Sequence, residues 1–243
     1  MIHIALRMAV KWGLINRNVA DGVDPPRIKK TDMKTWDEHE VHILLDNAKD
    51  SPYYALFYIA LYTGMRRSEL LALRWKDIDF IYSQIYVNRS LHHLKDGRYV
   101  FTAPKSERSR RTIALPPSAF LVLSEYRKQK ETEALMIETQ IKDSDLVFCN
   151  IDGTPWRPNT ITRTWSIMAA KTGVSVIRLH DARPTHASLM LKQGIHPKVV
   201  QERLGHSSIT MTLDIYSHVA PGLQEAAAKR FDDIVSSKVV VNL

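Results

Sequence analysis

The sequence has a single cysteine and lacks an apolar run long enough to cross a membrane. One cysteine cannot form an intrachain disulfide, and the absence of CxxC or Cys/His spacings argues against a cysteine-based zinc site. Cys149 lies in an apolar run, residues 146–149, so we expect it to pack in the core. The N-terminus also lacks the charged start, apolar stretch and cleavage site of a signal peptide. Together these absences predict a cytoplasmic protein without a membrane partner.

What the chain does have is an ample apolar content and an excess of basic residues. Hydrophobic residues make up 44% of its 243 positions, enough for one large domain or for one domain plus part of a second. Lysine and arginine number 34 against 26 acidic residues, which gives a net charge of +8. This balance favours a polyanionic partner such as nucleic acid. Because many basic proteins bind no DNA, charge alone does not decide the function.

Apolar periodicity and turn residues predict a mainly α fold with a small antiparallel β-sheet, an α+β protein. A helix over residues 2–12 is followed by a Pro- and Gly-containing linker. A capping box at Thr35–Glu38 opens the next helix. Further helices are expected at 52–64, 67–74, 117–138, 158–171, 181–193, 197–204, 208–216 and 223–235, and β-type runs at 78–80, 84–87, 98–101, 111–115 and 146–149.

Six basic and hydroxyl side chains, spread over the C-terminal two-thirds, form the candidate catalytic set. They are Arg66, Lys105, His180, Arg183, His206 and Tyr216. Guanidinium groups hold the non-bridging oxygens of a phosphodiester, and a phenol oxygen can attack phosphorus. The set therefore suits chemistry at a phosphodiester without an acidic cluster.

Four segments, in this order, resemble motifs of the tyrosine recombinases, the family of phage and transposon integrases: TGMRRSELLALRWKDID, KSERSRRTIALP, HDARPTHASLML and VQERLGHSSITMTLDIYSHV. The resemblance runs from about Thr35 to the C-terminus and implies the catalytic-domain fold of that family. It implies that residues 1–27 are the last helix and linker of a core-binding domain, and that residues 28–243 are the catalytic domain. We therefore expect most of the core-binding domain to be missing.

The resemblance also implies a function and a role for each residue. The protein would be a site-specific recombinase or integrase of a phage or mobile element that cuts and rejoins DNA without a metal or other cofactor. Arg66 and Arg183 would clamp the phosphate, and Tyr216 would form a 3′-phosphotyrosine. Lys105 would protonate the departing 5′ oxygen, and one of His180 and His206 would relay the tyrosine proton while the other donates to a phosphate oxygen. Glu69 would orient a guanidinium, and DNA contacts are expected at Arg67, Arg108, Arg110 and Arg111.

Other interpretations compete with these assignments. Lys95 competes with Lys105, Glu69 could be an ordinary helix-surface acid, and the histidines at 180, 186, 206 and 218 could bind a metal in a metal-dependent nuclease. His186, His92 and His93 are otherwise expected to be packing or surface residues. Pro184 stands where the family usually has histidine, and proline disfavours helical backbone at the residue before it, Arg183. A catalytically impaired DNA-binding remnant is therefore the alternative function.

The resemblance finally implies a partner and an assembly. The partner is double-stranded DNA, which would associate the protein with the nucleoid. In the family, the C-terminal helix couples protomers in a tetramer on DNA. Here the amphipathic segment beyond Pro221 would dock on a neighbouring protomer or pack on its own domain.

Overall fold

The computed structural model describes residues 2–24, 34–94, 96–104 and 110–219, together with a few positions between 228 and 235. Within the last helix, side chains are described as far as Ile215. The chain divides into two compact units, Met1–Asp32 and Met33–Leu243. No helix in the described ranges combines the length and the apolarity that a membrane span needs.

The first unit is small and contains helix α1 (Ile2–Lys11) and the 3-10 helix η1 (Val19–Gly22). Asn18 joins them, because its side chain accepts from Ala20 N–H at 3.0 Å and donates to the carbonyl of His3 at 3.2 Å. The predicted helix over 2–12 is confirmed to within one residue. Its apolar residues Ile4, Met8 and Trp12 are exposed, and the assignment of this unit to a core-binding domain stays a prediction.

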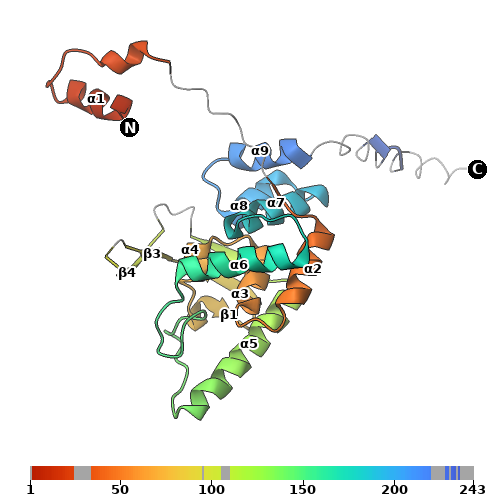
Figure 1. Ribbon diagram of the computed structural model, residues 1–243. Helices are drawn as coiled ribbons and strands as arrows, with labels where there is room; N and C mark the ends of the chain where they lie inside the picture. The colour runs from red at the N-terminus through yellow and green to blue at the C-terminus, as the bar shows by residue number, and fades with distance from the viewer. Residues whose placement is uncertain are drawn as a thin grey trace, which may run out of the picture. The chain divides into compact units, whose positions relative to one another are not determined.

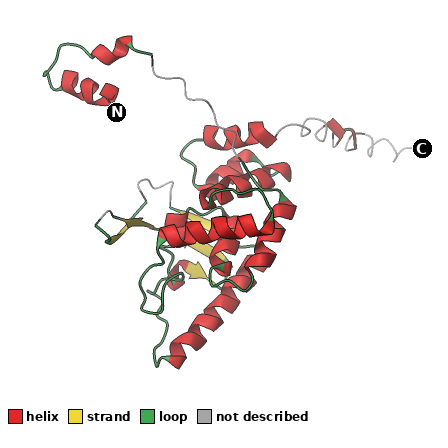
Figure 2. Cartoon of the chain, viewed as in Figure 1, coloured by secondary structure: helices red, strands yellow, loops and turns green. Residues whose placement is uncertain are grey.

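The second unit is mainly helical, as expected, and Figures 1 and 2 show its helices around a small sheet. Its elements are α2 (Glu38–Ala48), α3 (Tyr54–Thr63), α4 (Arg67–Leu70), η2 (Trp75–Asp77), β1 (Ile78–Asp79), β2 (Gln84–Val87), β3 (Ser90–His93), β4 (Tyr99–Thr102), β5 (Arg111–Ala114), α5 (Pro117–Met136), α6 (Pro158–Thr172), η4 (Leu179–Asp181), α7 (Ala182–Lys192), α8 (Pro197–Leu204) and α9 (Thr210–Val219). The antiparallel sheet has the order β1-β2-β5, and its register pairs Ile85 with Ile78 and with Ile113. Strands β3 and β4 form a separate antiparallel hairpin.

The core surrounds α3, whose residues are apolar on nearly every side and buried along almost its whole length. Trp36 stacks on Trp165 of α6 with ring centroids 5.0 Å apart, and Phe57 of α3 meets Trp165 edge-on at 5.2 Å. Both indole N–H groups donate to carbonyls of the segment before η4, those of Ser175 and Ile177. Since that segment leads directly into α7, these aromatic contacts fix where α7 starts.

A second apolar cluster holds the C-terminal helices together. Leu191 of α7, Val200 and Leu204 of α8, and Ile215 of α9 are all buried in it. Helices α7, α8 and α9 therefore pack as one group, and α7 also packs against α3. Through α7, this group of helices is joined to the core around α3.

Some local predictions were wrong. The capping box before α2 lies two residues later than expected, because Asp37 caps Glu40 N–H at 2.8 Å while the backbone N–H of Trp36 donates to Thr185. The expected strand at 146–149 is reduced to isolated bridges, Arg74 with Leu146 and Cys149 with Pro155. The helix expected over 67–74 ends at Leu70, and strand β3 was not expected. Cys149 is half-buried rather than fully packed in the core, and its Sγ contacts the Leu146 carbonyl at 3.3 Å.

Candidate active site

The site begins at the turn where α3 ends. Gly64 caps α3 with φ of +64°, a left-handed conformation that glycine adopts without strain. A β-carbon at this position would overlap the Leu204 side chain and approach His186 Cδ2 to 3.1 Å. The close approach of α3, α7 and α8 therefore requires glycine, and it places Arg66, two residues later, beside the ends of α7 and α8.

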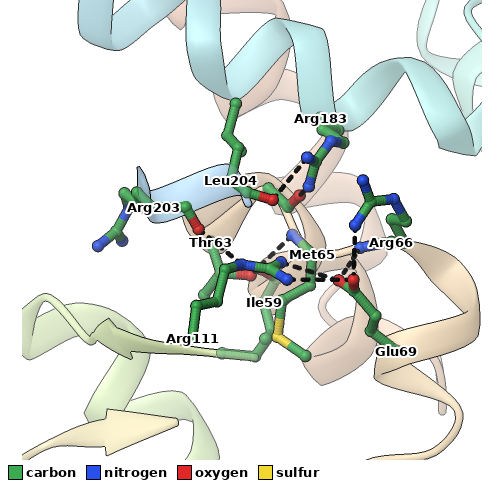
Figure 3. Close-up of polar contacts among 10 residues, drawn as sticks. Ile59, Thr63, Met65, Arg66, Glu69, Arg111, Arg183, Arg203 and Leu204 are labelled. Atoms are coloured by element: carbon green, nitrogen blue, oxygen red, sulfur yellow. Dashed lines mark hydrogen bonds and ion pairs between the residues drawn. The ribbon is translucent and has the colours of Figure 1, made fainter. Parts of the chain in front are cut away.

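Glu69 is the buried carboxylate at the centre of the site (Figure 3). Its Oε1 accepts from Arg66 Nη1 at 2.8 Å, and its Oε2 accepts from the backbone N–H of Arg66 at 2.8 Å and from Arg111 Nη2 at 2.8 Å. Burial alone would raise the pKa of Glu69, but the hydrogen bonds and charges of Arg111 and Arg66 outweigh it and lower the pKa to about 2. Glu69 is thus ionised at neutral pH and orients two guanidinium groups, so it is not an ordinary surface acid.

Arg183 lies on the opposite side of this turn, in the first turn of α7. Its Nη1 donates to the Gly64 carbonyl at 2.9 Å and its Nη2 donates to the Leu204 carbonyl at 2.6 Å. Burial, with repulsion from Arg66 and Arg111, lowers the pKa of Arg183 to about 9, so the group still carries its charge at neutral pH. Within the described residues, the hydrogen bonds of this buried cation go to neutral carbonyls, so it is well suited to receive an anion.

Pro184 does not keep Arg183 out of the helix. It is the third residue of α7, within the first turn, where a backbone N–H has no partner inside the helix in any case. The guanidinium of Arg183 is fixed by the two carbonyls described above. Arg183 is helical despite the local preference set by Pro184, because the start of a helix tolerates proline, and the effect of Pro184 on the activity stays a prediction.

His206 follows α8 and is held from two directions. Its Nδ1 lies 2.9 Å from Thr212 Oγ1, and its carbonyl accepts from Gln201 Nε2 at 3.2 Å. Burial, followed by the charges of Arg183, Arg66 and Arg111, lowers the pKa of His206 to about 4. The imidazole is therefore neutral at physiological pH, with Nδ1 engaged and Nε2 available to a substrate.

His180 opens onto a cavity of about 370 Å³ beside Arg66. The cavity is lined by Arg66, Arg67, Ser68, Thr162, Arg178, Leu179 and His180. Burial lowers the pKa of His180, opposed by Asp181 and reinforced by Arg183, Arg178 and Arg66. The walls of this cavity are thus strongly basic, as a phosphate site requires.

Arg203 and His186 form a second hydrogen-bonded group, next to the turn at Gly64. Arg203 of α8 donates from Nε to His186 Nε2 at 3.0 Å, and from its Nη atoms to the carbonyls of Ala114 and Tyr62. The other ring nitrogen of His186 lies 2.9 Å from the Leu61 carbonyl, so it must carry the proton. Burial and then Arg203 lower the pKa of His186 to about 3. With both nitrogens occupied, His186 is a packing residue and is not available as a metal ligand.

Several predicted residues fall outside this description. Lys105, its competitor Lys95, and Arg108 lie outside the described residues. Tyr216 lies in α9, and its side chain, like that of His218, is outside the described part. Arg110 is exposed, whereas the side chain of Arg111 is only 5% exposed and pairs with Glu69. Among the described side chains, no three His, Cys, Asp or Glu residues gather as a metal site would need.

The structure thus brings together Arg66, Glu69, Arg183, His206 and, at the adjoining cavity, His180. Sequence reasoning missed Thr212, which contacts His206, and Arg203, which braces α8. Arg203 is distant in sequence from His186, and a turn separates Thr212 from His206, so no local sequence pattern reveals either contact. It also missed that backbone carbonyls, those of Gly64 and Leu204, are what aim Arg183.

The chain is similar to known proteins over most of its length. The profile of the phage integrase family matches residues 34–222. The ICEBs1 integrase of Bacillus subtilis is 33% identical over 230 residues, covering 93% of this chain and 62% of the relative. A XerC-like tyrosine recombinase of Caldanaerobacter subterraneus is 30% identical over 243 residues, with the same two coverages of 93% and 62%. The chain therefore spans about 62% of the length of these relatives.

Solved structures share the fold. The Tn1549 transposon integrase in complex with transposon right end DNA superimposes with a TM-score of 0.74 at 23% identity, covering 94% of this chain and 76% of that one. The XerA recombinase superimposes with a TM-score of 0.62 at 22% identity, covering 94% and 74%. From the profile match, which takes in Arg66, Arg183, His206 and Tyr216, this chain belongs to the phage integrase family.

Proposed function

We propose that the chain is the catalytic part of a tyrosine-type site-specific recombinase of a phage or other mobile element, acting on double-stranded DNA. The observation that carries this proposal is the convergence of Arg66, Arg183 and His206 around Glu69 and the turn at Gly64. Relatives with integrase and recombinase names, and a transposon integrase solved with DNA, support the same reading. In this proposal residues 1–27 are the end of a core-binding domain and residues 28–243 are the catalytic domain.

Arg66 and Arg183 act on the phosphate that is cleaved. Attack on phosphorus builds negative charge on the non-bridging oxygens, so cations fixed beforehand around those oxygens lower the barrier. Glu69 fixes Arg66, and two carbonyls fix Arg183. Pre-oriented guanidinium groups lose little freedom when the phosphate binds, which is the condition for effective electrostatic catalysis.

His206 supplies a hydrogen bond to the same phosphate. A neutral imidazole donates a hydrogen bond from only one of its nitrogens. When the Thr212 hydroxyl donates to Nδ1, the proton of the His206 ring is on Nε2, which can then donate to the phosphate. His180, on the rim of the cavity, accepts or relays the proton of the attacking phenol. The opposite assignment of these two roles fits the geometry less well, because His206 is buried whereas His180 lies at the lining of the cavity.

Tyr216 and Lys105 complete the reaction. The phenol oxygen of Tyr216 attacks phosphorus and forms a 3′-phosphotyrosine, and the 5′ oxygen leaves with a proton from Lys105. Attack by the 5′-hydroxyl of a second strand then reverses the step and releases the tyrosine. Each step exchanges one phosphodiester for another, so no nucleotide cofactor is consumed. Arg108 and Arg110 contact the DNA backbone nearby, and Arg111 contributes there through its pairing with Glu69.

We further propose that the residues beyond Pro221 dock on a neighbouring protomer and assemble a tetramer on DNA. An apolar groove of about 560 Å³ on the catalytic unit, lined by side chains that include Val41, Leu61, Leu115, Leu189 and Met190, is large enough to receive apolar side chains of such a segment. Deleting residues 222–243 should leave DNA binding by single protomers in place and abolish higher-order complexes in native gels. Unchanged complexes after the deletion would contradict this assembly.

The proposed activity is tested with suicide duplexes that carry a nick near the scissile phosphate. After cleavage the short fragment with the free 5′-hydroxyl dissociates, so the covalent intermediate is trapped. Wild-type protein should form an adduct that survives denaturing gels. An inactive DNA-binding remnant would bind the same duplexes without forming any adduct, and that outcome would favour the alternative function.

A further inference from the structure

The cavity beside Arg66 is also lined by Arg67, and only part of the hydrogen-bonding capacity of the Arg67 guanidinium is used by its neighbours. Arg67 Nη1 donates to Thr162 Oγ1 at 2.6 Å and to the Pro158 carbonyl at 3.2 Å. Within the described residues, Nε and Nη2 of Arg67 make no hydrogen bond to the protein. Burial lowers the pKa of Arg67 without any contribution from an acid.

The other two arginines that line this cavity are each paired with a carboxylate. Arg66 is paired with Glu69 at 2.8 Å and Arg178 is paired with Asp181 at 2.8 Å, in both cases with the carboxylate three residues later. The partners of Arg67, the Thr162 hydroxyl and the Pro158 carbonyl, are neutral and do not compensate its charge. Both belong to α6, which therefore holds the guanidinium in one orientation. A fixed, half-buried guanidinium with free donors and no carboxylate partner in the described chain is well placed to bind an anion.

The side chains that line the cavity indicate which class of anion would bind there. Ser68 and His180 add neutral hydrogen-bonding groups, and Arg66 and Arg178 add charge. Oxygens of a phosphate accept several such donors at once. Because Arg66 and Arg67 are consecutive residues lining the same cavity, an anion on Arg67 lies next to the phosphate assigned to Arg66.

We infer that Arg67, held by Thr162, binds a second phosphate of the same DNA strand, one nucleotide away from the phosphate that Arg66 and Arg183 clamp. This inference rests on the proposed function for the identity of the first phosphate. Two adjacent phosphates held at once fix the strand in both position and direction. Arg67 is accordingly a positioning residue that aligns the scissile phosphate, and it takes no part in bond making.

Small nucleotides test the second site without knowledge of the target sequence. Thymidine 3′,5′-bisphosphate carries two phosphates one nucleotide apart, and thymidine 3′-phosphate and 5′-phosphate carry one each. Titration calorimetry or NMR titration would give the ratio of bisphosphate to monophosphate affinity. Wild-type protein should prefer the bisphosphate by about tenfold or more, the value of one charge-assisted hydrogen-bonded contact.

Arg67→Gln should remove this preference and leave the affinity for the monophosphates within about twofold. Thr162→Val, which keeps the charge but removes the anchoring hydroxyl, should reduce the preference by several-fold at unchanged net charge. Arg163→Gln is the matched control, since it removes the same charge from an exposed neighbouring position on α6 that does not line the cavity. If Arg67→Gln fails to fold, Arg67→Lys and Thr162→Val carry the test.

A wild-type protein without preference for the bisphosphate, or a preference retained in both Arg67→Gln and Thr162→Val, would overturn the inference. The proposed function fails separately, through the absence of covalent adducts on suicide duplexes. A bisphosphate preference that depends on Arg67 in a protein that forms no adduct would leave the second phosphate site standing and reject the enzyme. Covalent adducts, together with a bisphosphate preference that the variants leave unchanged, would support the enzyme and reject the second phosphate site.

Discussion

The most direct stability test of the site is the replacement of Glu69 by glutamine. The two side chains have nearly the same size and shape, so the change removes charge and keeps volume. In the folded protein the Glu69 carboxylate accepts hydrogen bonds from Arg66 and Arg111 and is only 4% exposed. The variant would leave both guanidinium groups with a weaker, neutral partner, and would turn an amide N–H₂ towards at least one of them.

The pKa of Glu69 sets the expected size of the effect. A fall from 4.5 to about 2 corresponds to about 3 kcal/mol of stabilisation at neutral pH. Loss of one partner of a buried ion pair costs a similar amount, about 3–5 kcal/mol. We expect a loss of about 3 kcal/mol in the free energy of unfolding, which lowers the melting temperature by roughly 6–12 °C for a unit of this size.

Urea unfolding monitored by tryptophan fluorescence measures this free energy, since Trp36 and Trp165 stack in the core. The sign of the pH dependence follows from a depressed carboxylate pKa. The stabilisation by Glu69 is present above about pH 4.5 and is lost as the pH falls towards 2. The difference between wild type and Glu69→Gln should therefore shrink over that interval.

Glu131→Gln is the control, because Glu131 pairs with Arg127 on the surface of α5 and its side chain is 47% exposed. Its removal should change stability by less than about 1 kcal/mol. A Glu69→Gln protein within about 1 kcal/mol of wild type, or a difference that does not shrink on acidification, would show that the ionised Glu69 carboxylate does not stabilise the fold.

The turn at Gly64, the buried histidines and the fixed arginines can each be tested separately. Gly64→Ala should destabilise the catalytic unit by more than about 1 kcal/mol in urea unfolding, because the new methyl group meets Leu204 at a φ of +64°; a neutral effect would contradict the tight turn. Wild-type stability should fall as the pH drops from about 6.5 to 4.5, because the folded state resists protonation of His186, His206 and His180, and His186→Gln should make that fall smaller; Glu69 adds its own loss only below about pH 4.5. Chelation with EDTA should leave adduct formation unchanged, since fixed arginines supply the positive charge; loss of activity restored by magnesium or zinc would favour the metal-dependent alternative.

Much of the site was predictable because its residues lie in short continuous motifs. Arg66, Arg183 and His206 each stand in a segment that resembles the family, and Glu69 follows Arg66 by three residues, a spacing that places both on one side of a helical turn. The mainly α fold was predictable for a related reason, since apolar periodicity and glycine stops mark most of the helices. Contacts within one short motif are thus predictable from the sequence.

Long-range pairings were not predictable in the same way. Arg111 was expected to contact DNA from a basic loop, yet its guanidinium is buried against Glu69, 42 residues earlier in the chain. The orientation of Arg183 depends on backbone carbonyls of two other segments, and carbonyls leave no mark in a sequence. Strand β3 was missed because its exposed residues His92 and His93 interrupt the apolar alternation, while pairing with β4 stabilises it.

Cleavage of DNA through Tyr216 can be measured by trapping the covalent intermediate. A pool of nicked duplexes of randomised sequence, incubated with the protein and digested with trypsin, would be analysed by mass spectrometry. We expect a nucleotide-bearing peptide whose modified residue is Tyr216, present in wild-type protein and absent from Tyr216→Phe, which should still bind the duplexes. An adduct on another residue, an adduct that persists in Tyr216→Phe, or duplex binding without any adduct would contradict it.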